Sequence, residues 1–207
     1  MSTFRHRPAV SDDLAAISEL MDLAIAENMK AFLTPEEIEV ARRSMGLDRL
    51  LVDDGTYFII EAPDITETPN PASDASVRWI MVGCGGWGRR KTLYGGDHTP
   101  GRDDSFANPL KDAARIRAMY THPGWVRKGI GSLLLELGED AARAAGFSRI
   151  ELGATLAGVP LYQARGYREV SRTMTDSPDS SVVEGDDRPE VADTIILMEK
   201  SLLNGAC

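Results

Sequence analysis

The residues best suited to chemistry lie in the stretch RKGIG, at residues 127–131. A strand is predicted to end shortly before this stretch and an amphipathic helix to begin within it, so free backbone N–H groups and the positive end of the helix dipole converge there. Glycine at positions 129 and 131 lets a bulky anion approach the backbone, and Arg127 and Lys128 add positive charge. The stretch therefore predicts a pyrophosphate-binding loop, with close helix packing as the alternative interpretation of the same glycines.

A second glycine-rich stretch, GCGGWG at residues 83–88, has the spacing G-x-G-x-x-G after the apolar run at residues 79–82. A dinucleotide-binding fingerprint also needs a helix that begins within the motif, because the pyrophosphate rests on its N-terminus. The sequence that follows, RRKTLYGGDHTPGRDD, is rich in glycine, proline and aspartate and does not predict a helix. We therefore expect these glycines to end a strand, with a packing or turn role.

The elements that must position the phosphate loop alternate between helices and strands. Ser11 is expected to cap the first helix, and Thr34-Pro35-Glu36-Glu37 has the pattern of a capping box with proline at the first helical position. Expected strands lie near residues 4–8 and at 56–62, 77–82, 114–120, 149–155, 167–172 and 194–200. Expected helices start at 11, at 35 and within 127–131, with a short one at 160–165.

The helix after the phosphate loop is the most strongly amphipathic of these elements. Gly146 supplies its expected C-terminal stop. Its predicted apolar face consists of Leu133, Leu134, Leu137, Ala141 and Ala145, and its predicted polar face of Glu136, Glu139, Asp140 and Arg143.

Length and composition limit the class of protein. A chain of 207 residues suits a single domain, which we place at residues 3–203 with irregular insertions at about 63–76, 91–112 and 174–192. The net charge of −9 disfavours non-specific nucleic-acid binding and mildly favours a cationic or amine-bearing partner, with plain solubility as the alternative interpretation. The two cysteines have neither disulfide nor metal-ligand spacing, so no metal is expected. With no signal-peptide or membrane-spanning pattern, we expect a cytoplasmic protein.

Two longer stretches resemble a known family. HPGWVRKGIGSLLLELGEDAARAAGF and IELGATLAGVPLYQARGYREV are similar to the GCN5-related N-acetyltransferase (GNAT) superfamily, and the similarity extends from about Arg115 to Val170. It implies an α/β (α+β) fold, a single domain with a mixed, mostly antiparallel twisted sheet of about six to seven strands flanked by about four helices. It also implies acetyl-CoA as co-substrate and an amine of a small molecule or protein as acceptor.

The resemblance assigns roles to residues of this chain. The family's Q/R-x-x-G-x-G/A loop corresponds to residues 126–131, with Val126 where glutamine or arginine is usual. The tyrosine of its L-Y-x-x-x-G-[FY] motif corresponds to Tyr162, which would protonate the departing thiolate. A usual asparagine is replaced by Thr155. The expected cofactor contacts are Met119, Thr121, Val126, Arg127, Lys128, Gly129, Ile130, Gly131, Ser132 and Thr155, and the expected oxyanion donors are the backbone N–H groups of Met119 or Tyr120.

The general base and the acceptor are less clearly specified. Many relatives have a glutamate on the strand before the phosphate loop, but this chain has none there, so Asp112, Glu151 and His122 are alternatives. We predict that no carboxylate base is essential and that water accepts the amine proton. The acceptor cleft is expected near residues 28–33 and 173–193. An acyl-CoA-binding sensor without turnover is the alternative function, and the resemblance also admits a homodimer.

Overall fold

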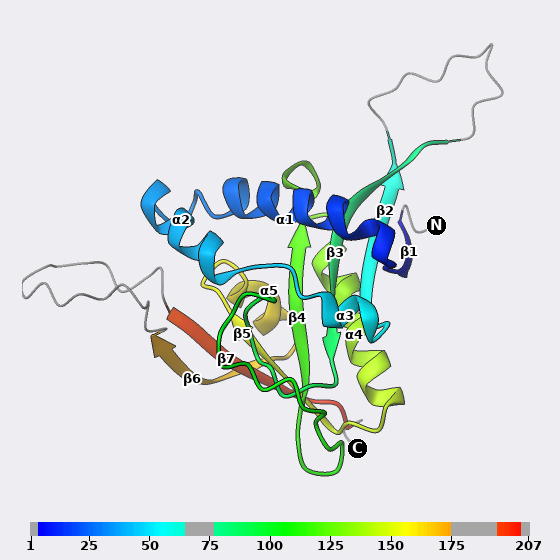
Figure 1. Cartoon of the computed structure of the whole chain (residues 1–207), viewed down its shortest axis with the longest axis vertical. Helices are drawn as coiled ribbons and strands as arrows, with labels where there is room; N and C mark the ends of the chain where they lie inside the picture. The colour runs from blue at the N-terminus through cyan, green and yellow to red at the C-terminus, as the bar shows by residue number, and fades with distance from the viewer. Residues whose placement is uncertain (1–3, 65–76, 175–193, 204–207) are drawn as a thin grey trace, which may run out of the picture.

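The computed structural model describes residues 4–64, 77–174 and 194–203. Within them, seven strands form one open sheet in the order β1-β2-β3-β4-β5-β7-β6 (Figure 1). Every neighbouring pair is antiparallel except β4 and β5, so the predicted mixed, mostly antiparallel sheet is confirmed. The strands are β1 (Arg5–Pro8), β2 (Tyr57–Pro63), β3 (Trp79–Gly88), β4 (Ala114–Thr121), β5 (Arg149–Ala154), β6 (Arg168–Met174) and β7 (Thr194–Ser201).

Helices cover both faces of this sheet. On one face, which we call the α1 face, Ile17 and Met21 of α1 pack in the same cluster as Tyr57 and Cys84 of the sheet. On the opposite α4 face, Leu134 of α4 packs with apolar residues of β2 and β3. The α-helices are α1 (Leu14–Asn28), α2 (Pro35–Ser44), α3 (Arg49–Asp53), α4 (Ile130–Ala144) and α5 (Val159–Ala164), with short 3-10 helices η1 (Ser11–Asp13) and η2 (Pro123–Trp125).

Two helix starts show how far local sequence determines capping. The predicted capping box of α2 is confirmed, because Thr34 Oγ1 accepts from the Glu37 N–H at 3.3 Å and Glu37 Oε2 accepts from the Thr34 N–H at 2.7 Å. The prediction that Ser11 caps the first helix is wrong. Ser11 begins η1, and the carboxylate of Asp13 instead accepts from the Val10 N–H at 2.8 Å. The five-residue helix α3 was not predicted, since it is too short to show a helical period.

The predicted polar face of α4 is wrong at one residue. Glu139 is only 3% exposed, and Leu135 and Gly138 are buried beside it. Glu139 Oε2 accepts from Lys200 Nζ of β7 at 2.6 Å. A buried carboxylate is tolerated where a cation pairs with it, and the partner lies 61 residues away, so the helical pattern alone could not reveal it.

The GCGGWG stretch remains in β3 and pairs with β2 on one side and β4 on the other. The predicted packing role is confirmed, but the chain makes no turn before Gly88. A side chain at Gly83 would collide with Ile130 at the start of α4, and one at Gly86 would lie 2.9 Å from Tyr57 Cα. The glycines thus allow helix and strand to approach β3 closely. Among the described residues, no helix is long and apolar enough to cross a membrane.

Candidate active site

The parallel strands β4 and β5 separate soon after they begin. Only two register pairs join them, Ala114 with Ile150 and Arg115 with Glu151. Strand β4 then continues to Thr121 without a described strand partner on this side, as the divergence of the two strands in Figure 1 shows. This opening, which we call the β4–β5 gap, leaves backbone groups of β4 available to a ligand.

A bulge in β4 decides which backbone groups face the gap. Gly86 is paired with Arg117 and Cys84 with Tyr120, so Ala118 and Met119 together lie opposite Gly85. The His122 N–H donates to the Val82 carbonyl at 2.9 Å, which sets the alternation along the strand.

This alternation separates the two candidate oxyanion donors. Like His122, Tyr120 turns its backbone groups toward β3, whereas Met119 and Thr121 turn theirs toward the β4–β5 gap. The geometry therefore favours the Met119 N–H over that of Tyr120. The backbone of Thr121 is already in use on one side, because its carbonyl accepts from Asn28 Nδ2 of α1 at 2.8 Å.

The predicted phosphate loop follows β4 and η2 and leads into α4. Arg127 has φ of 62° and Gly129, the N-cap of α4, has φ of 93°, so both adopt the left-handed conformation. This conformation turns successive backbone N–H groups in one direction. Residues 126–129 are exposed, and Ile130 anchors the helix start at 1% exposure. Lys128 Nζ lies 4.3 Å from the centre of the Trp125 ring.

The phosphate loop also adjoins α5, which carries Tyr162. A Cβ on Gly131 would lie 2.7 Å from Leu161 Cδ2, so the glycine lets the two helices approach. Ser132 follows in the first turn of α4 and is partly buried. Thr155, just after β5, has an exposed side chain, and its carbonyl accepts from the Gly158 N–H at 2.9 Å to turn the chain toward α5.

Tyr162 is held by its neighbours as a neutral phenol. Its ring contacts Tyr167 edge-on at 6.0 Å between centroids and crosses Gly158, where a Cβ would lie 2.6 Å from Tyr162 Cε2. Burial raises the pKa of Tyr162 to about 12, so its hydroxyl stays protonated at neutral pH. The pKa of Tyr120 is also raised, first by burial and then by Cys84 and Tyr162.

The three groups weighed as general bases all make structural contacts. Asp112 Oδ2 accepts from the Asn108 N–H at 2.7 Å, and Glu151 Oε2 accepts from Arg115 Nη1 at 2.7 Å. His122 Nδ1 accepts from the Gly124 N–H at 3.1 Å and so caps η2. These contacts agree with the prediction that no carboxylate base is essential, which remains a prediction.

The insertion between β3 and β4 covers part of the gap on the α1 face. Arg117 Nη1 donates to the Thr92 carbonyl at 2.9 Å, and Arg117 Nη2 donates to the Gly95 carbonyl at 2.6 Å. Tyr94 lies against β5, where a Cβ on Gly153 would be 3.8 Å from Tyr94 Cβ. Residues 92–95 therefore cross from β4 to β5, and we call them the crossing segment.

A buried ionic cluster holds the crossing segment in place. Asp48 Oδ2 accepts from Arg117 Nη2 at 2.8 Å and from Arg102 Nη2 at 3.1 Å, and Arg102 also donates to Asp104 at 2.9 Å. The side chains of Asp48, Arg117 and Arg102 are 2%, 4% and 7% exposed. Sequence reasoning missed this cluster, because its members are charged and come from three distant segments. The local signal is limited to Arg117, one of two arginines in β4.

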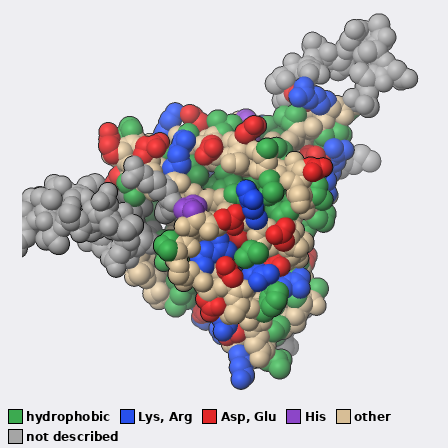
Figure 2. All heavy atoms as spheres, viewed as in Figure 1, with side chains coloured by type: hydrophobic (Ala, Val, Ile, Leu, Met, Phe, Trp, Pro, Cys, Tyr) green, Lys and Arg blue, Asp and Glu red, His purple; other side chains and the backbone are tan. Residues whose placement is uncertain are grey.

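The predicted acceptor region lies partly within the described residues. The loop at 28–33 begins at Asn28, whose contact with Thr121 places it at the end of β4. Glu36 and Glu39 of α2 are exposed nearby in the chain, and Figure 2 shows acidic and basic side chains interspersed over α1 and α2. Most of the second predicted segment, residues 175–193, lies outside the described residues.

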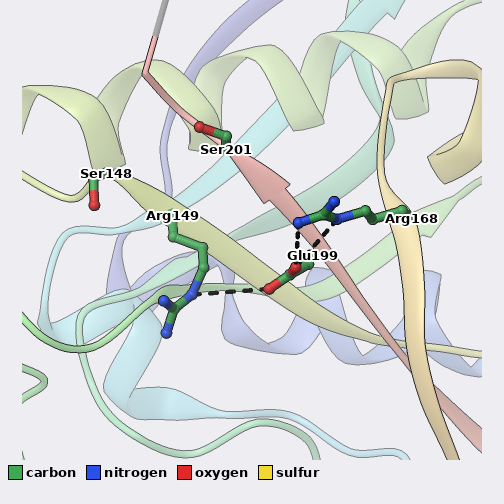
Figure 3. A pocket seen from close by; sticks show the side chains of 5 residues that line it. All are labelled: Ser148, Arg149, Arg168, Glu199 and Ser201. Atoms are coloured by element: carbon green, nitrogen blue, oxygen red, sulfur yellow. Dashed lines mark hydrogen bonds and ion pairs between the residues drawn. The ribbon is translucent and has the colours of Figure 1, made fainter.

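A surface pocket of about 190 Å³ lies at the other end of the sheet. Figure 3 shows Arg149 and Arg168 on either side of Glu199, with Arg168 Nη2 donating to Glu199 Oε1 at 2.9 Å. Arg149 precedes Ile150, which pairs with the first residue of β4, whereas the phosphate loop follows the last. At about 3.3 Å per residue, β4 separates the two places by roughly 20 Å. The pocket is lined by Ser148, Arg149, Arg168, Glu199 and Ser201.

Comparison with known proteins identifies this architecture. The family model described as acetyltransferase (GNAT) domain matches residues 79–169, which include β3, β4, the phosphate loop, α4, β5 and α5. No curated protein matches the sequence significantly.

Three solved structures illustrate the similarity of fold. A GCN5-related N-acetyltransferase from Rhodopseudomonas palustris is 18% identical, with a TM-score of 0.59 and 97% of each chain covered. A protein described as an acetyltransferase from Salmonella typhimurium, solved with acetyl-CoA, is 18% identical, with a TM-score of 0.54 and coverage of 100% of this chain and 98% of that chain. An N-acetyltransferase from Thermoplasma acidophilum in complex with coenzyme A is 15% identical, with a TM-score of 0.53 and coverage of 97% and 99%. The sequence match and the shared fold thus agree: residues 79–169 match the acetyltransferase (GNAT) domain model, and the chain has the fold of GCN5-related N-acetyltransferases.

Proposed function

We propose that the protein is an acetyl-CoA-dependent N-acetyltransferase that acts on a primary amine. The observation that carries this proposal is the β4–β5 gap, whose free strand edge leads through η2 into the left-handed loop at the start of α4. An extended chain can pair with the strand edge while its phosphates meet the helix N-terminus. Acetyl-CoA has this combination of parts, and it is present in the similar Salmonella structure.

Different residues would position different parts of acetyl-CoA. Backbone N–H groups of the phosphate loop, assisted by Arg127 and Lys128, would hold the pyrophosphate. Backbone groups of Met119 and Thr121 would pair with the pantetheine arm, and the Met119 N–H would stabilise the negative charge that develops on the thioester oxygen.

The transfer step follows from this arrangement. The neutral amine nitrogen attacks the thioester carbon, so a carbon–nitrogen bond forms and the carbon–sulfur bond breaks. The hydroxyl of Tyr162 gives its proton to the departing thiolate and recovers one from solvent. The proton lost by the amine passes to water, since Asp112, Glu151 and His122 already have structural partners.

The acceptor is an amine on a small molecule or a protein. The crossing segment covers the gap between Arg117 and Gly153, so we propose that the acceptor enters between this segment and the α1–α2 connection. The net charge of −9 favours a cationic acceptor. A cytoplasmic location and a homodimer remain predictions.

The first experiment is isothermal titration of the full chain with acetyl-CoA, with NADH titrated in parallel. We expect saturable binding of acetyl-CoA and none of NADH. A panel of primary amines is then tested for release of free CoA thiol. Absence of acetyl-CoA binding contradicts the proposal. Tight acetyl-CoA binding with no release of CoA thiol with any amine of the panel would favour the acyl-CoA-binding sensor.

A further inference from the structure

The bulge in β4 contains a residue with a strained backbone conformation, which persists only if surrounding contacts stabilise it. Ala118 has φ of 50°, in the left-handed region that residues with a side chain rarely adopt. It shares with Met119 the position opposite Gly85. A Cβ on Gly85 would lie 3.0 Å from Met119 Cα, so the two strands are in close contact at the bulge.

Tyr57 of β2 reaches this bulge from the other side of β3. Its hydroxyl donates to the Ala118 carbonyl at 2.7 Å and also lies 3.3 Å from Cys84 Sγ. Tyr57 is 2% exposed and Cys84 is fully buried, so water does not replace these contacts. A Cβ on Gly86, the register partner of Tyr57, would lie 2.9 Å from Tyr57 Cα, so the glycine lets the backbone of β2 approach β3 closely here.

This hydrogen bond connects to the reaction through the register of β4. If the Ala118 carbonyl lost its partner, the strand would gain by returning to regular pairing with β3. Because successive residues alternate, removal of the bulge would exchange the groups that face β3 and the gap, and the Met119 N–H would turn away from the thioester.

We propose that Tyr57 is a positioning residue, which holds the β4 bulge through the Ala118 carbonyl and thereby aims the Met119 N–H into the β4–β5 gap. This inference rests on the proposed acetyl transfer. Burial raises the pKa of Tyr57 well above its ordinary value, so its hydroxyl remains a hydrogen-bond donor over the working pH range.

The test compares Tyr57→Phe with Cys84→Ala in the full chain. Tyr57→Phe keeps the ring and removes the hydroxyl, with its contacts to both Ala118 and Cys84. Cys84→Ala removes only the second of these contacts and leaves the bond to Ala118. We expect Tyr57→Phe to lower kcat about tenfold with little change in the KM for acetyl-CoA, because the misplaced N–H acts mainly on the transition state. Cys84→Ala should retain the wild-type kcat.

Two spectroscopic measurements separate positioning from a general loss of stability. With selective ¹⁵N-methionine labelling, the Met119 amide resonance should shift in Tyr57→Phe and not in Cys84→Ala. In infrared difference spectra of bound acetyl-CoA labelled with ¹³C at the acetyl carbonyl, the carbonyl band should move toward its position in free acetyl-CoA only in Tyr57→Phe. All measurements are made below the unfolding transition of each variant.

The outcomes distinguish this inference from the proposed function. The role of Tyr57 is overturned if Tyr57→Phe has the same kcat, the same Met119 amide chemical shift and the same carbonyl band as the wild type. The proposed acetyl transfer is unaffected by that result. An equal loss of kcat in Cys84→Ala also overturns it, because the effect would then come from disturbed packing. If the wild-type protein neither binds acetyl-CoA nor transfers its acetyl group, the proposed function fails and this inference fails with it.

Discussion

The two sides of the β4–β5 gap are built by different kinds of interaction. On the α4 face, the phosphate loop is placed by glycines that let α4 approach the sheet and α5, as at Gly83 and Gly131. On the α1 face, the crossing segment is placed by the charged side chains Asp48, Arg102 and Arg117. The first side depends on the absence of side chains at close contacts, and the second on buried charges that must be paired.

Because of this difference, the two sides of the gap should tolerate different substitutions. A glycine contact fails when a side chain is added, and the damage depends on whether the neighbouring atom can move. A buried ion pair fails when one partner is removed, because the remaining charge stays buried without compensation. We therefore expect truncations to damage the α1 face most and charge or backbone changes to damage the phosphate loop in a graded way.

The largest expected effect is on stability, from Asp48→Ala. This substitution leaves Arg117 and Arg102 buried without their shared carboxylate, and we expect the free energy of unfolding to fall by about 3–5 kcal/mol. Urea denaturation followed by circular dichroism measures it. As a control, Glu39→Ala removes an exposed partner of Arg42 and should have little effect. Equal stability of Asp48→Ala and wild type would show that the cluster does not hold the crossing segment.

The next effect concerns catalysis. Tyr162→Phe should lower kcat about a hundredfold with little change in the KM for acetyl-CoA, because it removes the proton donor to the thiolate. Tyr167→Phe, which preserves the ring contact with Tyr162, is the matched control and should retain activity. Steady-state kinetics of both variants test the assignment, and a similar loss in both would reject it.

The raised pKa of Tyr162 gives this assignment a pH signature. A general acid must be protonated to act, and a pKa of about 12 keeps the phenol protonated as pH rises. The rate that depends on Tyr162 should therefore stay level between pH 7 and about pH 10. An alkaline decrease near pH 10 that disappears in Tyr162→Phe would show that the phenol titrates at its ordinary value.

A smaller effect is expected from charge reversal in the phosphate loop. Arg127→Glu should weaken acetyl-CoA binding about tenfold at low salt and less at high salt, because Arg127 is exposed and its attraction is screened. Titration calorimetry at two ionic strengths measures the change. Lys111→Glu makes the same change of charge at an exposed position before β4 and serves as the control. Equal weakening by both variants would indicate a general charge effect instead of a local site.

The smallest effect is expected from Gly129→Ala. Gly129 has φ of 93°, but no atom lies within 4 Å of the added Cβ, so the cost is backbone strain of about 1 kcal/mol. Thermal and urea unfolding of this variant measure the strain. If Gly129→Ala lowered the free energy of unfolding as much as Asp48→Ala, the loop would tolerate substitution no better than the ionic cluster. The proposed contrast between the two faces would then be wrong.

The features that could be predicted from the sequence are those that depend on neighbouring residues. The capping box at Thr34, the glycine stop at Gly146 and the strand before the phosphate loop could be predicted, because each depends on residues close together in sequence. The cap of the first helix was wrongly given to Ser11, which lies inside η1. The side chain that bonds to the backbone at this helix start is Asp13, which accepts from the Val10 N–H and is held by Arg7.

The sequence by itself determined the order of the elements and the place of the glycine-rich loop before α4, since periodicity, glycines and helix starts act over a few residues. Tertiary structure alone decided that Glu139 is buried beside Lys200, that Asp48 pairs with Arg117, and that Ala118 lies in a bulge held by Tyr57. In each case the partners are 61 to 69 residues apart. Burial and charge pairing depend on which surfaces meet in three dimensions, and a local pattern contains no information about a partner that the fold brings from so far away.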